Sequence, residues 1–299
     1  MQPVEHLLDL GDVTIAARDW GGPPKAPALL MVHGLASNAR IWDLTAPQLA
    51  AERRVVAIDQ RGHGRSAKPD VGYDLPTAVH DLAGAITALG LVRPLVVGHS
   101  WGANVALQLA AEQPGLVAGV VLVDGGTTEF AATMGLEEAL ERLAPPRLAG
   151  TPRDLLVGRI RLRWPDEAWR PEIEHAILGN FAIDSADRLT PHLTFERHLE
   201  LVRAMWHQRP TQVFPRVGCP VLIIPVAPQV MNDEAAQWMA LKRASVAAAE
   251  AGIPRARVVW AHDSIHDLPL HRPEFLANRI TEFAYELVPY VPPGARSPR

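Results

Sequence analysis

The 299-residue sequence is poor in cysteine, lysine and long apolar runs. Its single cysteine, Cys219, excludes an internal disulfide framework and any metal site built from several cysteines. With 29 Lys and Arg against 33 Asp and Glu, the formal net charge is −4. The chain therefore lacks the basic excess of a nucleic-acid-binding protein. No apolar run approaches the roughly 18 residues that span a membrane.

The N-terminal residues and the absence of metal-binding motifs indicate the localisation, partners and cofactors to expect. The first residues, MQPVEHLLDLGD, carry acids where a signal peptide carries Lys or Arg, and they contain no continuous apolar stretch. We therefore expect a cytoplasmic protein with no nucleic-acid or membrane partner. The sequence contains no HExxH motif and no cysteine pair, so we expect no metal and no cofactor. The sequence does not indicate an oligomeric state.

Short apolar runs alternate with segments of helical periodicity. This alternation is typical of a mostly parallel central sheet covered by helices on both faces. The predicted strands are 13–19, which alternates like an edge strand, then 28–33, 54–59, 94–98, 117–124, 220–225 and 257–260. The predicted helices are 76–89, 103–113, 233–251 and 273–287. The sequence thus predicts an α/β fold.

Residues 128–214 interrupt the alternation. The segment contains helix-like pieces and no convincing strand, so we interpret it as a helical insertion. This divides the chain into a core domain, residues 1–127 and 215–299, and an inserted segment, residues 128–214. The aromatic residues of the insertion are expected mainly to pack its core.

The pentapeptide Gly98-His99-Ser100-Trp101-Gly102 is the strongest chemical signal. It matches the pattern G-x-S-x-G, directly follows an apolar strand and directly precedes a helix, which is the context that the motif requires. A serine on such a sharp turn projects its hydroxyl from the end of the sheet, and the helix N-terminus beneath it favours negative charge. Ser100 is therefore the predicted nucleophile.

Two further segments complete a resemblance to the α/β-hydrolase fold superfamily that covers nearly all of residues 10–287. His33-Gly34-Leu35 resembles the oxyanion segment of that family, and residues 59–66, DQRGHGRS, resemble its D-x-R-G-x-G-x-S turn. The resemblance assigns the oxyanion hole to the backbone N–H groups of Leu35 and Trp101. It identifies residues 128–214 with the cap (lid), inserted after the sixth strand. We expect His33 to brace its loop and the Trp101 side chain to line the substrate pocket.

The resemblance also identifies the general base among twelve histidines. His266 follows the strand predicted over 257–260 and precedes the last helix, where the family carries its catalytic histidine. Its nearest rivals are His262, close to the strand, and His271, close to the helix. We therefore predict His266 as the base.

The acid departs from the commonest family pattern. Gln229 occupies the position where an Asp usually follows the strand after the cap, and an amide cannot supply the negative charge that stabilises an imidazolium. Asp124 ends the preceding strand, and the order Ser100, Asp124, His266 keeps the chain order of the family. We predict Asp124 as the acid, with Asp233 and Asp263 as alternatives.

These residues predict a serine hydrolase, an esterase or lactonase without cofactor, that acts on a small-molecule carboxylic ester or lactone through an acyl-enzyme. A thioesterase, a C–C bond hydrolase or a cofactor-free perhydrolase could use the same triad. A non-catalytic ligand receptor on the same fold is the alternative from a different class. Epoxide hydrolysis and dehalogenation would need a carboxylate at position 100.

Overall fold

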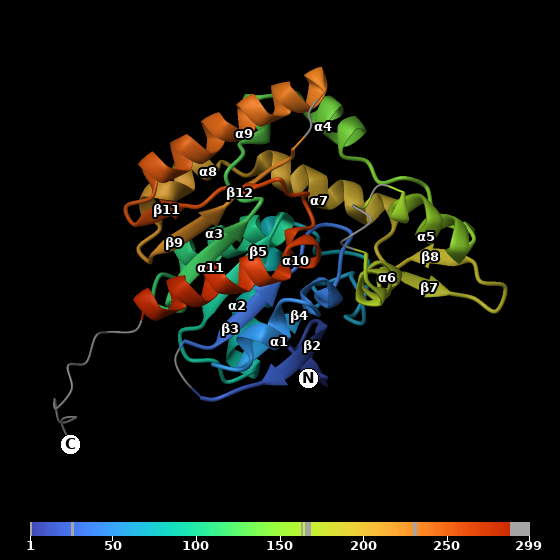
Figure 1. The fold of residues 1–299 in the computed structure, drawn as a ribbon, viewed down its shortest axis with the longest axis horizontal. Helices are drawn as coiled ribbons and strands as arrows, with labels where there is room; N and C mark the ends of the chain where they lie inside the picture. The colour runs from blue at the N-terminus through green and yellow to red at the C-terminus, as the bar shows by residue number, and fades with distance from the viewer. Residues whose placement is uncertain (1, 25–26, 163, 165–168, 230–231, 288–299) are drawn as a thin grey trace.

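The structure, a computed structural model, describes residues 2–24, 27–162, 164, 169–229 and 232–287. Its centre is an eight-stranded sheet of order β1-β2-β4-β3-β5-β6-β9-β11 (Figure 1). The strands are β1 (Val4–Asp9), β2 (Thr14–Gly21), β3 (Leu29–Val32), β4 (Val55–Ile58), β5 (Leu95–His99), β6 (Gly119–Val123), β9 (Val221–Ile224) and β11 (Ala256–Val258). The strands from β4 to β11 in this order run parallel, and β1 and β2 pair antiparallel.

Helices cover both faces of the sheet, as the sequence predicts. The helices that follow or connect the strands are η1 (Ala39–Trp42), α1 (Ala46–Leu49), α2 (Leu75–Ala88), α3 (Trp101–Glu112), α9 (Asp233–Gly252), α10 (Leu268–His271) and α11 (Pro273–Glu286). Alternate residues of one strand enter different core clusters: Leu30 packs with α2 and α3, and Met31 packs with α1 and α11. The predicted apolar strands are buried on both faces for this reason.

The sheet differs from the prediction at one edge. The expectation that residues 13–19 form an edge strand is wrong, because β2 lies between β1 and β4. β2 is mostly buried, whereas the edge strand β1 is exposed, with Leu7 65% exposed. The sequence prediction missed β1, which has neither a continuous apolar run nor a regular alternation.

Residues 128–214 form a mostly helical segment between β6 and β9. Its elements are η2 (Phe130–Ala132), α4 (Leu136–Arg142), α5 (Arg153–Arg161), α6 (Pro171–Leu178), β7 (Phe181–Ile183), β8 (Leu189–Pro191), α7 (Phe195–His207), α8 (Pro210–Val213) and η4 (Phe214–Arg216). Figure 1 shows α5, α6, β7 and β8 gathered on one side of the molecule, away from β9 and β11. The expectation of no strand is wrong, since β7 and β8 form an antiparallel hairpin. Strands of three residues are too short to show a two-residue period.

The later part of this segment packs closely on the sheet. Leu201, Met205 and Phe214 belong to the same core cluster as α2 and α3. The division of the chain at residues 128 and 214 therefore remains a prediction about independent folding. Two short parallel strands, β10 (Val226–Ala227) and β12 (Ala261–His262), lie beyond the main sheet. Within the described ranges, no helix is both long and apolar enough to cross a membrane.

Candidate active site

Ser100 occupies the sharp turn between β5 and α3. Its backbone has φ 52° and ψ −119°, a conformation that non-glycine residues rarely adopt. The Ser100 N–H donates to Val123 O at 2.9 Å, which fixes the turn to β6. A Cβ atom on Gly98 would lie 2.3 Å from Gly102 O, and one on Gly102 would lie 2.4 Å from Val32 O. Both glycines are therefore required by the close passage of neighbouring backbone.

The structure brings His266 and Asp124 together. His266 Nδ1 lies 2.6 Å from Asp124 Oδ2, within hydrogen-bonding distance. Asp124 directly follows β6 and has φ 45°, and its N–H donates to Ile224 O at 3.0 Å. His266 lies in the loop between β12 and α10. Two loops that are 142 residues apart in the sequence thus place an imidazole against a carboxylate.

Lys242 and Val226 hold the other oxygen of the Asp124 carboxylate. Asp124 Oδ1 accepts hydrogen bonds from Lys242 Nζ at 2.7 Å and from Val226 N at 3.0 Å. Burial raises the pKa of Asp124, but its contacts with His266 and Lys242 outweigh burial and lower the pKa overall. The carboxylate is therefore charged at neutral pH. Sequence reasoning missed Lys242, although the scarcity of lysine on this chain was an available signal.

Opposing influences act on the pKa of His266. Desolvation by the surrounding loops lowers the pKa of His266, whereas the hydrogen bond and the charge of Asp124 raise it, and the net shift is upward. The side chain is 54% exposed and lines, with Ser100, a cavity of about 590 Å³. Among the described residues, no side-chain hydrogen bond joins Ser100 to His266. Such bonds are often long in unliganded enzymes and shorten when substrate binds.

Leu35 and Trp101, the predicted oxyanion donors, follow two neighbouring strands. Trp101 is the first residue of α3, and Leu35 follows β3, the strand next to β5. In the described part of the chain, neither N–H donates a recorded hydrogen bond. Both donors are therefore available, and the N-terminus of α3 adds a partial positive charge.

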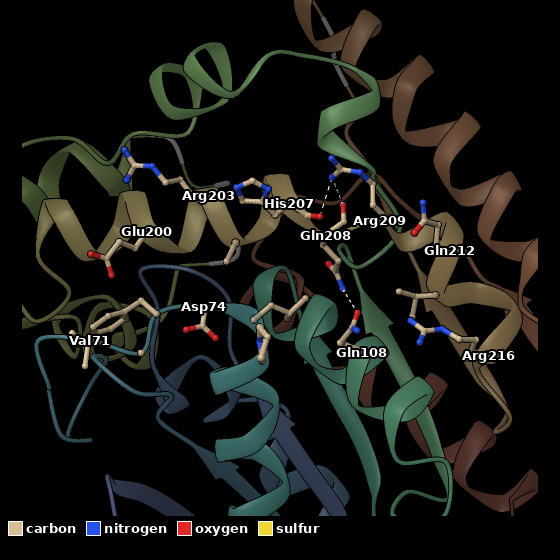
Figure 2. A pocket seen from close by; sticks show the side chains of 16 residues that line it. Val71, Asp74, Gln108, Glu200, Arg203, His207, Gln208, Arg209, Gln212 and Arg216 are labelled. Carbon is tan, nitrogen blue, oxygen red and sulfur yellow. Dashed lines mark hydrogen bonds between the residues drawn. The ribbon is translucent and has the colours of Figure 1, made fainter.

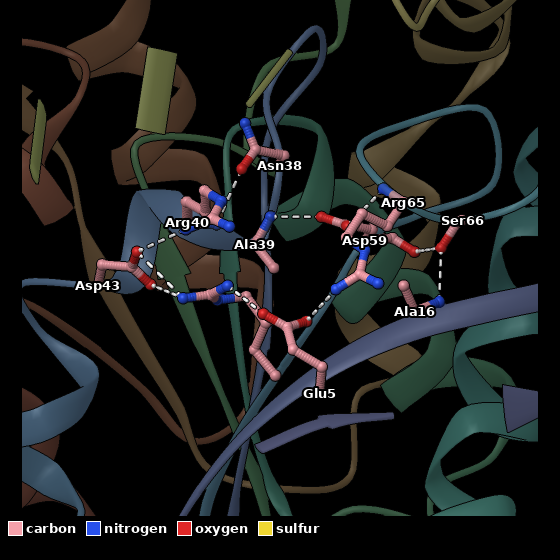
Figure 3. A network of polar contacts seen from close by, with 10 residues as sticks. Glu5, Ala16, Asn38, Ala39, Arg40, Asp43, Asp59, Arg65 and Ser66 are labelled. Atoms are coloured by element: carbon pink, nitrogen blue, oxygen red, sulfur yellow. Dashed lines mark hydrogen bonds and ion pairs between the residues drawn. The ribbon is translucent and has the colours of Figure 1, made fainter. Parts of the chain in front are cut away.

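The loop that contains Leu35 is braced from two sides. His33 is fully buried, and its Nε2 accepts a hydrogen bond from Gln60 N at 3.0 Å, in agreement with the expected bracing role. Asp59 accepts from Ala39 N at 2.7 Å and from Arg65 N at 2.8 Å, which ties the loop after β3 to the loop after β4 (Figure 3). A rigid loop keeps the Leu35 N–H in one orientation.

A further histidine supports the loop that carries His266. His99, which precedes Ser100, is fully enclosed, and its Nε2 lies 2.9 Å from the carbonyl oxygen of His266. Burial lowers the pKa of His99 to about 4, so the ring is neutral and its Nε2–H donates to that carbonyl. Sequence reasoning assigned no role to His99, because the contact depends on the packing of two distant loops.

The expectation that the Trp101 side chain lines the substrate pocket is wrong. The indole is 1% exposed and packs within the core between the sheet and α2, because the first turn of α3 directs it inward. The large apolar side chains of the 590 Å³ cavity come from other segments: Phe130, Leu143, Met205, Trp238 and Met239. A second cavity of about 590 Å³ contains Ala36, just beyond Leu35, and the inserted aromatic residues Phe181 and Phe195.

The rival candidates lie away from this arrangement. In the described residues, His266 makes no recorded hydrogen bond with Asp233, which begins α9, or with Asp263. Gln229 is exposed. A separate hollow of about 630 Å³ between α2 and α7, which contains Arg203, does not include Ser100, Asp124 or His266 (Figure 2). No group of three or more metal-binding side chains occurs in the described ranges.

Comparisons with known proteins identify the family of the chain. Residues 29–279 match the model of the alpha/beta hydrolase family. The chain is 36% identical over 121 residues to 2-(acetamidomethylene)succinate hydrolase of Mesorhizobium japonicum, covering 40% of this chain and 42% of the relative. It is 38% identical over 125 residues to epoxide hydrolase B of Mycobacterium tuberculosis, covering 40% and 35%. These matches thus span less than half the length of either relative.

The fold is shared over a greater length. The crystal structure of E-2-(acetamidomethylene)succinate hydrolase matches with a TM-score of 0.76 at 24% identity, covering 94% of this chain and 98% of that chain. The relatives described here are named as hydrolases of different bonds, so the comparison supports the fold and a hydrolytic class rather than one substrate.

Proposed function

Because the chain belongs to the alpha/beta hydrolase family, we propose that it is a serine hydrolase that cleaves a carboxylic ester or a lactone through an acyl-enzyme intermediate. The observation that carries the proposal is the 2.6 Å contact between His266 Nδ1 and the buried carboxylate of Asp124, beside a cavity that Ser100 also lines. We refer to Ser100, His266 and Asp124 as the proposed triad.

In the proposed reaction, Ser100 Oγ attacks the carbonyl carbon and His266 Nε2 accepts the hydroxyl proton. Asp124 accepts the hydrogen bond from Nδ1–H, which selects the tautomer with Nε2 free and stabilises the imidazolium that forms. His266 then donates the proton to the leaving alkoxide. Water, activated by the same imidazole, attacks the acyl-enzyme and releases the acid.

The oxyanion is stabilised by backbone donors. The N–H groups of Leu35 and Trp101 stabilise the negative charge that develops on the carbonyl oxygen, and each donor of this kind is worth roughly 3–4 kcal/mol. Both belong to segments whose backbone is fixed by hydrogen bonds to neighbouring strands or loops. They therefore need little reorganisation as charge develops.

The cavity favours an apolar acyl group. Phe130, Met205 and Trp238 line it, and Lys242, the only lysine or arginine among the lining residues, already binds Asp124. We propose that residues 128–214 act as the cap that sets selectivity, since Leu143 and Met205 of this segment line the cavity. An uncharged short- to medium-chain ester fits this environment best.

Other reactions on the same residues are less well supported. The relative named epoxide hydrolase B shares local sequence, but a serine at position 100 lacks the carboxylate that epoxide opening through an ester intermediate requires. A C–C hydrolase, a thioesterase or a perhydrolase would use the proposed triad without change. A non-catalytic receptor would have no need for a strained serine beside an available base.

A substrate panel tests the proposal. We expect p-nitrophenyl esters of short to medium chain, or simple lactones, to be hydrolysed by the wild-type protein and not by Ser100→Ala. Inactivity toward the whole panel, with the protein folded, would contradict the esterase proposal and favour C–C bond hydrolysis. Activity that survives in Ser100→Ala would contradict the proposed nucleophile.

A further inference from the structure

We propose that Lys242 is a positioning residue of the proposed triad, whose ammonium group orients the Asp124 carboxylate and whose charge limits how strongly His266 holds its proton. The inference rests on the proposed function for its catalytic meaning. Its physical content, an interaction between Lys242 and His266 through Asp124, can be measured without any substrate.

The first argument is the division of the Asp124 carboxylate between its partners. Lys242 Nζ and Val226 N both donate to Oδ1, whereas His266 lies against Oδ2. The Asp124 side chain is only 4% exposed, so water does not compete for these oxygens. Two donors on one oxygen fix the plane of the carboxylate and leave the other oxygen for the imidazole.

The second argument is the placement of Lys242 itself. Its side chain is 14% exposed, and Nζ also donates to Val226 O at 3.2 Å. The ammonium group thus has two fixed acceptors, one of them the carboxylate. A lysine held in this way differs from a surface lysine, whose long side chain samples many rotamers.

The third argument concerns the loop before α9 and the helix α9 itself. The loop that leads from β9 into α9 contains Gln229, at the position that the family resemblance assigns to the acid. Here the acid comes from the end of β6, and α9 contributes the cation that binds it. The segment after β9 thus contributes Lys242, a cation that binds the acid, in place of the acid itself.

Charge around His266 gives the fourth argument. Asp124 and Asp267 favour the protonated imidazole, and Lys242 disfavours it. His99, whose ring centroid lies 4.7 Å from that of His266, is neutral because burial lowers its pKa. Lys242 is therefore the cation that counteracts the two carboxylates, so its removal should raise the pKa of His266.

The test is an NMR titration of the His266 imidazole, assigned with His266→Gln, in the wild type, Lys242→Met and Lys242→Arg. A cation a few ångströms beyond the carboxylate corresponds to a shift of about one pH unit, so we expect Lys242→Met to raise the pKa of His266 by about that amount. Lys242→Arg keeps the charge and should restore the wild-type value. Arg243→Met, which removes a neighbouring positive charge on α9, serves as the matched control and should leave it unchanged.

The same variants have a kinetic signature once a substrate is known. The acidic limb of kcat/KM should move to higher pH by the same amount in Lys242→Met. At any pH well below the limb, kcat/KM of this variant should therefore be about tenfold lower than that of the wild type. If Lys242→Met lowers the melting temperature but moves neither the His266 titration nor this limb, Lys242 is a structural ion-pair partner and the inference is wrong.

Lys242→Met leaves the buried Asp124 carboxylate without its cation, and a second variant is used if this protein does not fold. In Asp124→Asn with Lys242→Met neither charge remains, and the pKa of His266 should be higher than in Asp124→Asn alone. Equal values in these two proteins would overturn the inference. The titration needs no turnover, so an inactive wild-type protein would contradict the proposed function and leave this result standing.

Discussion

The sheet and the inserted segment 128–214 differ in how firmly they hold their side chains. Every residue of β3, β5 and β6 is buried, and the N–H groups of Ser100 and Asp124 donate to strands next to their own. The part of the inserted segment from α4 to β8 is looser, because its elements are short and Leu155 and Leu162 are exposed. The groups proposed for chemistry thus lie on the rigid part, whereas the inserted segment adds Thr128, Phe130, Leu143 and Met205 to the wall of the cavity beside Ser100.

The two parts also differ in how they are tied to the rest of the molecule. Backbone hydrogen bonds and the contact between two side chains position Ser100, Asp124 and His266. These contacts do not depend on the substrate. The inserted segment is tied to the loop after β3 at few points, among them a hydrogen bond from Asn38 Nδ2 to Ala176 O at 2.7 Å. We therefore expect substitutions between α4 and β8 to leave the proposed triad in place.

The largest expected effect comes from the rigid part. Ser100→Ala should lower kcat/KM for an ester substrate by at least about 10⁴-fold, because the nucleophile is lost while binding remains. The melting temperature should stay close to that of the wild type, since alanine removes only the hydroxyl group. Phe130→Leu, at the wall of the cavity, is the comparison variant and should keep most of the activity.

Removing the charge of Asp124 should have the next largest effect. Asp124→Asn should lower kcat by at least about 10²-fold with folding intact by circular dichroism, because an amide favours the wrong imidazole tautomer. Since Asp124 raises the pKa of His266, the acidic limb should also move to lower pH. Retention of more than about a tenth of the activity, together with its loss in Asp233→Asn or Asp263→Asn, would reassign the acid.

A deletion tests the looser part. Gly150 N donates to Leu189 O at 2.8 Å, so the ends of residues 151–188 lie side by side and a two-glycine link can replace them. The deleted residues line the second cavity, beside Ala36, through Leu156, Ile160 and Phe181. We expect the sheet to remain folded and the preference among acyl chain lengths to change by about tenfold if the acyl chain extends into that cavity, since one methylene group in an apolar pocket is worth roughly 1–3 kcal/mol. Loss of cooperative unfolding would show that these residues are required for the core.

The last effect concerns the stability of the fold and leaves the proposed chemistry untouched at neutral pH. Burial lowers the pKa of His33 and His99 to about 4 and that of His63 to about 3. The pKa of a histidine in the unfolded chain is about 6.5. A histidine whose pKa is lower in the folded state stabilises the fold at pH values above about 6.5, and this contribution is lost as the pH falls. The free energy of unfolding in urea should therefore fall below pH 6.5, by at most about 4 kcal/mol per pH unit. A constant value down to pH 5 would contradict their neutral burial.

The sequence was most informative where one local rule decides the structure. Apolar runs located the parallel strands, and the glycines around Ser100 identified the turn because backbone crowding leaves no alternative there. It failed for β1 and the β7–β8 hairpin, whose few residues carry no clear period.

Contacts between distant loops could not be predicted from the sequence either. The bonds from Lys242 to Asp124 and from His99 to the His266 carbonyl depend on how α9 and the loop after β12 pack. The direction of the Trp101 indole depends likewise on the first turn of α3, which no residue pattern specifies. Local sequence rules describe segments, whereas these features arise from their arrangement.

The central claim is that Ser100 is a nucleophile activated by His266 and Asp124, and covalent labelling tests it most directly. The folded protein is treated with a fluorophosphonate, and the intact mass and the modified peptide are determined. We predict one adduct per chain on Ser100, formed fastest above the pKa of His266, slowed by at least about 10²-fold in Asp124→Asn and absent in Ser100→Ala. No adduct on the folded wild-type protein, or an adduct on another residue, would contradict the claim.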